Sequence, residues 1–277
     1  MNFDDHLASL RVHAEAGFER ELLDATYRSF ACNDTDLRLC YFAVSFREWL
    51  RHLLARRSPD AEVRACKWWA PSSQRGDQLT RRDRLRFAVA GGLDLDSLEI
   101  EFGLDFSDRI GEVLAITNRL SQWTHVGPKS WGLSANEVRQ SASEVGRVVL
   151  SYLAAIEELR EEVVQGLEGY FDRSLFERLI EEEWPELLEV STHHEIDSVQ
   201  IDDVSVTGID SKWVMFEGSG EVTASLGYGR GEDGVELSHS FGCRASFCAP
   251  LDGIRSDGLR ALDVQIDTES WYGYEDD

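Results

Sequence analysis

The stretch from Glu186 to Ile209 reads ELLEVSTHHEIDSVQIDDVSVTGI, and the pattern of the chain changes inside it. From Ile196 onward, β-branched residues alternate with polar ones, which is typical of strands with one buried face. Before this stretch, apolar residues recur at helical spacing instead. We therefore expect an α+β protein, with a helical domain over residues 1–185, a linker over 186–195 and a β-rich domain over 196–277.

Helical spacing and end signals predict an all-α bundle in the first domain. Ser134 is a candidate N-cap, and Glu137 completes a capping box with it at the start of the longest helix. Ser58-Pro59 is expected to end the second helix and to open a loop over residues 58–77. The expected helices span 4–30, 34–57, 80–90, 95–102, 105–124, 134–166 and 170–184.

The second domain alternates short β-branched runs with Gly, Asp and Ser. This pattern predicts an antiparallel meander or small sandwich of about five or six strands. The sequence IDSKW, residues 209–213, predicts a tight hairpin turn. Acidic residues within the strands indicate that one face of the sheet is solvated. They are Asp202, Asp203, Glu217, Glu221, Asp263 and Asp267.

Composition limits the class of protein. The five cysteines (Cys32, Cys40, Cys66, Cys243 and Cys248) include no CxxC pair, which argues against a disulfide framework or a zinc site. No window approaches the roughly 18 apolar residues of a membrane span. The N-terminus is acidic and polar, unlike a secretory signal. We expect a cytoplasmic protein without a metal or other cofactor and without membrane contact.

Charge is distributed unevenly along the chain. Of the formal net charge of −24, residues 132–277 carry −22, from 10 basic and 32 acidic residues. The segment from Arg47 to Arg86 carries +6 and is the expected place for contact with a nucleic-acid backbone. The alternative is that its arginines are solvated and pair with nearby acids. The candidate RNA contacts are Arg51, Lys67, Trp68, Trp69, Arg81, Arg82 and Lys129.

An Arg–His pair lies near the end of one expected helix, in the sequence NRLSQWTHVGPKSW at residues 118–131. On a helical wheel, His125 falls opposite the apolar residues Ile116, Leu120 and Trp123, and Arg119 flanks the polar face. A neutral imidazole there is suited to general-base catalysis near pH 7. A guanidinium beside it is suited to holding a phosphate.

A second match of the same spacing runs from Arg47 through Glu48 to His52 on the second expected helix. These residues occupy the side opposite the apolar stripe, which consists of Leu39, Phe42, Phe46, Trp49, Leu50 and Leu53. Such spacing also arises by chance, so both pairs have a structural alternative as polar residues on helix surfaces. Trp68 and Trp69 have the corresponding alternative of anchoring a loop to the core.

The R-x(4–6)-H spacing near a helix end, within an all-helical bundle, resembles the HEPN superfamily of ribonucleases. The phrase LSQWTHVGPKSWG, with CKWW before it and a β-rich tail containing DTESWY, resembles more closely the predicted pPIWI-associating nucleases of bacterial conflict systems. The HEPN resemblance covers roughly residues 1–185, and the fuller one spans the chain.

The resemblance implies a metal-independent endoribonuclease. In HEPN enzymes the Arg and His of two protomers commonly meet at a dimer interface, activate a ribose 2′-hydroxyl and leave a cyclic phosphate. By motif, Arg119 and His125 take these roles. Leu120 stands where many HEPN proteins have a polar residue, and Asn118 is the candidate to replace that group. Arg47, Glu48 and His52 are secondary candidates. The implied partners are RNA, a second copy of the chain and a Piwi-like or other defence protein.

Two functions from different classes follow. The first is an endoribonuclease effector of a bacterial defence system, whose β domain binds a partner or regulates the nuclease. The second is a catalytically inactive helical interaction or sensor module in a defence complex, with Arg119 and His125 as helix-end contacts. The surroundings of His125 in the folded protein discriminate between the two.

Overall fold

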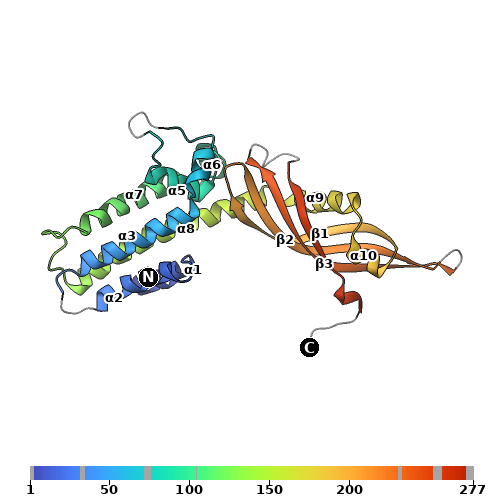
Figure 1. The fold of residues 1–277 in the computed structure, drawn as a ribbon, viewed down its shortest axis with the longest axis horizontal. Helices are drawn as coiled ribbons and strands as arrows, with labels where there is room; N and C mark the ends of the chain where they lie inside the picture. Colours follow the sequence, from blue (N-terminus) through green and yellow to red (C-terminus); the bar gives the residue numbers. More distant parts are fainter. Residues whose placement is uncertain are drawn as a thin grey trace. The chain divides into compact units, whose positions relative to one another are not determined.

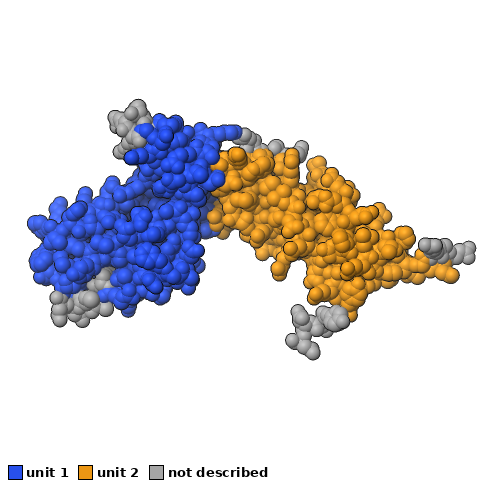
Figure 2. Space-filling model, in the orientation of Figure 1, with its two compact units in different colours: residues 1–159 blue, residues 160–277 orange. Residues whose placement is uncertain are grey.

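The computed structural model describes residues 3–31, 35–71, 76–103, 105–229, 233–251 and 258–272. Its contacts divide the chain into two compact units, residues 1–159 and 160–277, which Figure 2 colours separately. The first unit is helical and the second is built on an antiparallel sheet (Figure 1). This confirms the predicted α+β class. Among the described residues, no helix combines the length and apolar character needed to cross a bilayer.

The first unit is a bundle built around α3, α7 and α8 (Figure 1). α7 runs antiparallel to α8. Arg109, near the start of α7, pairs with Glu158 in the second half of α8, whereas Arg119, near the end of α7, pairs with Glu144 in the first half. The helices are α1 (Phe3–Val12), α2 (Phe18–Ala31), α3 (Arg38–Arg57), α4 (Asp60–Ala65), α5 (Arg81–Ala90), α6 (Leu95–Phe102), α7 (Phe106–Trp123) and α8 (Ala135–Gln165).

The apolar stripe of α3 forms the centre of this bundle. All six residues predicted to face the core are buried, and Phe42, Phe46 and Trp49 are fully enclosed. Their rings contact one another, with centroids 5.5 Å apart for Phe42 and Phe46 and 5.2 Å apart for Phe46 and Trp49. Fully burying one large apolar side chain contributes about 1.5–3 kcal/mol, so this stripe fixes which side of α3 faces solvent.

The predicted start signal of α8 is confirmed, and two other boundaries differ from expectation. Ser134 and Glu137 form the predicted capping box at the start of α8. The helix expected over 4–30 is instead two helices, separated at Gly17, whose φ of 88° lies in the left-handed region. Residues 60–65, expected to be loop, form the short helix α4 after Pro59.

The second unit contains a four-stranded meander in the order β1-β2-β3-β4, with each neighbouring pair antiparallel. Phe171 on α9 packs against one face, with its ring 5.3 Å from that of Phe216 and 5.2 Å from that of Phe247. The elements are α9 (Glu168–Glu181), α10 (Pro185–Val190), β1 (His193–Ile209), β2 (Trp213–Tyr228), β3 (Val235–Pro250), β4 (Arg260–Asp267) and a 3-10 turn (Glu269–Tyr272).

The expectation of five or six strands is wrong for the described residues, which form four. The runs KWVMFEG and EVTASLGYG are one strand, β2, which continues through Gly218 and Gly220 because β1 and β3 pair with it on both sides. The IDSKW turn is confirmed, since the Asp210 carboxylate accepts hydrogen bonds from the backbone N–H groups of Lys212 and Trp213.

The change from helix to strand occurs at β1, whereas contacts divide the chain after Leu159. The physical reason is that α9 packs on the sheet. Its Ser174 hydroxyl donates to the Leu259 carbonyl and accepts from the Ala261 N–H, and the Asp172 carboxylate accepts from the Ile201 N–H. The last part of the helical segment therefore belongs to the compact unit of the sheet.

An ion pair between the buried carboxylate of Glu19 and the exposed guanidinium of Arg56 joins α2 to α3. Glu19 is 7% exposed, and Arg56 donates to its two carboxylate oxygens at 3.1 and 3.0 Å. Burial alone would raise the pKa of Glu19, but the hydrogen bonds from Arg56 and from the Glu15 N–H lower it overall. The pair therefore stabilises the fold above the unfolded pKa of Glu19, and this contribution is lost as pH falls through the lowered folded value.

Arg56→Met should lower the free energy of unfolding by about 2 kcal/mol at pH 7, because Glu19 stays buried without its partner. The deficit should shrink near pH 4, where protonation removes the unpaired charge. Urea unfolding at both pH values measures this difference. Arg28→Met, at an exposed position on α2, is the control and should change little. An Arg56→Met deficit that is equal at both pH values would contradict this account of the pair.

Candidate functional site

The C-terminal end of α7 presents His125 to solvent on a fixed backbone. The His125 N–H donates to the Gln122 carbonyl at 3.2 Å, and the His125 carbonyl accepts from the Ser130 hydroxyl at 2.9 Å. Ser130 is buried and also accepts from the Gly127 N–H. Asn118 and Gln122 are exposed on the same face, while Ile116 and Leu120 are buried, as the wheel predicted.

Arg119 points away from this face. Its guanidinium donates to Glu144 on α8 at 2.7 Å and lies 5.9 Å from the ring centroid of Trp123. Among the described residues, no hydrogen bond links Arg119 to His125. The predicted catalytic pair is therefore not assembled within one copy of the chain.

Arg47 on α3 contacts the C-terminal end of α7, whereas Arg119 is directed towards α8. Its guanidinium lies 3.5 Å from the Thr124 hydroxyl, directly before His125 in the chain, and it also donates to Glu48 at 3.1 Å. Arg51 donates to the other Glu48 oxygen at 2.8 Å. The hydrogen bond from Arg51, helped by that from Arg47, lowers the pKa of Glu48 although partial burial acts in the opposite direction. Glu48 is therefore a carboxylate at neutral pH.

The ring of His52 contacts a neighbouring side chain, whereas His125 is exposed to solvent. The Arg51 guanidinium lies 2.9 Å from His52 Nε2. Arginine only donates hydrogen bonds, so Nε2 is the acceptor in this contact. The His52 ring also meets Phe18 edge-on, with centroids 5.1 Å apart. The lone pair that would accept a substrate proton is occupied in the second Arg–His match.

The candidate RNA contacts lie on several elements. Arg81, at the start of α5, donates to the Asn118 side chain at 3.4 Å and so links α5 to the polar face of α7. Arg82, Lys129 and Lys67 are exposed. Within the first unit, charged groups from α3 and α5 thus meet the polar face of α7.

Trp68 and Trp69 anchor the segment after α4. Both are partly buried against Val63, Cys66 and Phe87. The Trp68 indole N–H donates to the Gly91 carbonyl at 2.9 Å, and the Arg86 guanidinium lies 4.6 Å from its ring centroid. One face of Trp68 is therefore already covered by a cation, which leaves less of its ring for stacking on a base.

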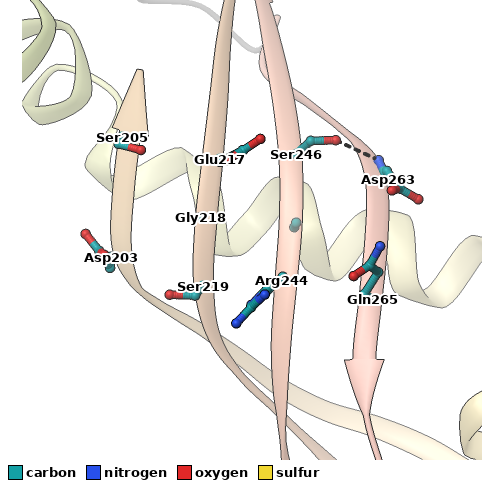
Figure 3. Close-up of a pocket in the computed structure, with 10 residues that line it drawn as sticks. Asp203, Ser205, Glu217, Gly218, Ser219, Arg244, Ser246, Asp263 and Gln265 are labelled. Carbon is teal, nitrogen blue, oxygen red and sulfur yellow. Dashed lines mark hydrogen bonds between the residues drawn. The ribbon is translucent and has the colours of Figure 1, made fainter. Parts of the chain in front are cut away.

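The outer face of the sheet is acidic and hollowed. Arg244 projects from β3 towards β2, among Asp203, Ser219 and Gln265 (Figure 3). The hollow measures about 450 Å³, and a second hollow of about 710 Å³ adjoins it. Every acid predicted on a solvated face is exposed, which confirms that interpretation of the strand pattern.

Among the described residues, no group of three or more His, Cys, Asp or Glu side chains has the arrangement of a metal site.

Three residues at the helical site were not among the sequence candidates. Thr124 receives Arg47, Ser130 fixes the His125 backbone, and Glu144 binds Arg119. Thr124 and Ser130 lie within the quoted motif, so proximity to His125 was an available signal. Glu144 is 25 residues from Arg119, and no local pattern indicates their contact.

Comparison with known proteins identifies both parts of the chain. Residues 11–149 match one family model and residues 156–272 match another, and both models are described as predicted pPIWI-associating nuclease. Neither the curated proteins nor the solved structures gave a match. Because the two matches together span both compact units, the chain belongs to the predicted pPIWI-associating nucleases.

Proposed function

We propose that this protein is a metal-independent endoribonuclease effector of a bacterial defence system and acts in the cytoplasm. The observation that carries the proposal is the meeting of α3 and α7, where Arg47 contacts Thr124 directly before the open imidazole of His125. Family membership supports a nuclease in general terms. RNA as the substrate and metal independence rest on the resemblance of the Arg–His spacing to HEPN enzymes.

In the proposed mechanism, His125 Nε2 or Nδ1 accepts the proton of a ribose 2′-hydroxyl, and that oxygen attacks the adjacent phosphorus. The 5′-oxygen of the next nucleotide leaves and takes a proton from water, His125 releases its proton to solvent, and a 2′,3′-cyclic phosphate remains. Guanidinium groups stabilise the charge that develops on the phosphorane. Arg47 is placed for this role in one protomer. Arg119 takes it after exchanging Glu144 for phosphate, and Asn118 supplies a neutral donor.

His125→Ala should abolish cleavage of mixed RNA in the presence of a chelator. Removing one stabilising donor typically costs about 10²–10³ in rate, so Arg47→Ala and Arg119→Ala should each fall within that range. Cleavage is followed on denaturing gels with purified full-length protein. His193→Ala, at an exposed position on β1, is the control and should retain full activity. Loss only in His52→Ala would assign the site to the α3 pair, and equal cleavage in all variants would reject both pairs.

A homodimer is part of this proposal, because Arg119 and His125 do not meet within one copy. Apolar side chains beside the site support it. Tyr41 and Val44 on α3 are 49% and 44% exposed, and Val126 and Trp131 after α7 are 61% and 52% exposed. The segment after α7 runs back along α3, since Gly132 N–H donates to the Asp36 carbonyl. Exposed apolar groups on neighbouring segments are typical of an association surface.

Val44→Glu should convert the dimer to a monomer and reduce RNA cleavage together with it, because a charge in an apolar interface is costly to desolvate. Light scattering after size exclusion measures the mass. Val12→Glu makes the same change at an exposed valine on α1 and should leave the mass unchanged. A wild type that is monomeric at every concentration, yet cleaves RNA at a rate proportional to its concentration, would contradict the dimeric site.

The outer face of the sheet is proposed to bind a basic surface of a partner, of which a Piwi-like protein is the candidate. Residues 160–277 carry 8 basic and 28 acidic residues. On the outer face, Asp203, Glu217 and Asp263 surround Arg244 (Figure 3), and no ion pair among the described residues neutralises these acids. Complementary charge steers association and favours partners of opposite sign.

Replacing Asp203, Glu217 and Asp263 by their amides should weaken binding of a labelled decalysine peptide by about tenfold at low salt. Fluorescence anisotropy measures the affinity. The matched control replaces Glu168, Glu181 and Glu189 by Gln, which makes the same charge change on the helices of the second unit. Equal weakening in both triple variants would mean that net charge, rather than the sheet face, attracts the peptide.

The alternative function is a catalytically inactive interaction or sensor module. The observation that favours it is the ion pair between Arg119 and Glu144, which gives Arg119 a structural role as a helix-to-helix contact. Under this alternative, purified wild-type protein would leave RNA intact with and without its partner, and Glu144→Gln would lower only the stability of the helical unit.

A further inference from the structure

A groove of about 850 Å³ lies between α1 and α8, and its lining includes Glu144, the partner of Arg119. α1 approaches α8 closely because Gly146 has no side chain, and a Cβ there would lie 2.9 Å from the His6 Cβ. The lining residues come from one face of each helix, at helical spacing. They include His6, His13, Glu144, Arg147, Leu150 and Ala154.

Two histidines at this groove are held neutral. His6 is 6% exposed, and its Nδ1 lies 3.4 Å from the Ser143 hydroxyl. Burial lowers the pKa of His6, and the positive charges of the N-terminal amino group and of Arg147 lower it further, against the hydrogen bond with Ser143 and the carboxylate of Asp5. Burial likewise lowers the pKa of His13, with Arg57 acting in the same direction and Glu157 against it.

Arg147 provides an exposed positive charge at the groove. No hydrogen bond or ion pair within the described part of the chain engages its exposed guanidinium. The nearest acid along α8, Glu144, is already neutralised by Arg119 at 2.7 Å. Beside Arg147, Leu150, Leu153 and Ala154 provide an apolar floor.

We propose that the α1–α8 groove binds a small organic anion. Its apolar or aromatic body covers Leu150, Leu153 and Ala154, and its carboxylate or phosphate pairs with Arg147. The volume falls in the range of small-molecule sites, which are mainly apolar with a few convergent polar groups. An anion placed beside His6 and His13 favours their protonated forms, so binding takes up protons and tightens as pH falls from 7.5 to 5.5.

The test is titration of the full-length chain, without RNA, with 8-anilinonaphthalene-1-sulfonate, an aromatic body that carries one anionic group. Wild type should bind saturably at one site, with rising fluorescence. Arg147→Gln should weaken this binding at least about tenfold, because it removes a charge-assisted hydrogen bond. Arg139→Gln, an exposed position on the same helix outside the groove, should bind as wild type does.

Competition identifies the kind of anion. Displacement by decanoate assigns a lipid-like carboxylate, and displacement by adenosine monophosphate assigns a nucleotide phosphate. Decanol has the same chain length as decanoate but no charge. If it displaced the probe as effectively as decanoate does, the anionic group would not contribute to binding, and the proposal would be overturned. Equal affinity in Arg147→Gln and Arg139→Gln, affinity that does not rise from pH 7.5 to 5.5, or the absence of saturable binding would overturn it as well. None of these outcomes depends on nuclease activity.

Discussion

Burial of the apolar stripe of α3 is the constraint on which the candidate site depends. With Phe42, Phe46 and Trp49 enclosed, the rotation of α3 about its own axis is fixed. Arg47 must then emerge at the boundary with α7, and Glu48 and Arg51 must face solvent. The polar cluster is thus positioned by apolar packing beneath it, which contributes far more to stability than its partly exposed ion pairs do.

The helical periodicity of the sequence predicted much of the first unit, because a helix with one buried face has apolar residues at regular spacing along that face. The stripe of α3, the polar face of α7 and the capping box at Ser134 were all predictable for this reason. The number of strands was not, because Gly218 and Gly220 are turn signals locally and strand residues once β1 and β3 pair beside them. Pairing between strands outweighed the local preference.

The partners of the site residues were harder to predict than the site residues themselves. His125 and its exposure followed from one helical wheel. The capture of Arg119 by Glu144 and the approach of Arg47 to Thr124 depend on how neighbouring helices are aligned, over separations of 25 and 77 residues. Spacing along one helix contains no information on that alignment. The α1–α8 groove could not be predicted for the same reason. The need for glycine at position 146 is visible only once His6 of α1 is seen to pack against it.

The central claim is that this chain cleaves RNA without a metal, through His125 and a ribose 2′-hydroxyl. The most direct measurement is the chemistry of the ends that it leaves on a defined RNA in the presence of a chelator, determined by mass spectrometry. The account predicts 2′,3′-cyclic phosphate and 5′-hydroxyl ends, and no product from the same RNA with 2′-deoxyribose at the cleaved position. Ends with 3′-hydroxyl and 5′-phosphate, formed only when a divalent metal is added, would contradict it.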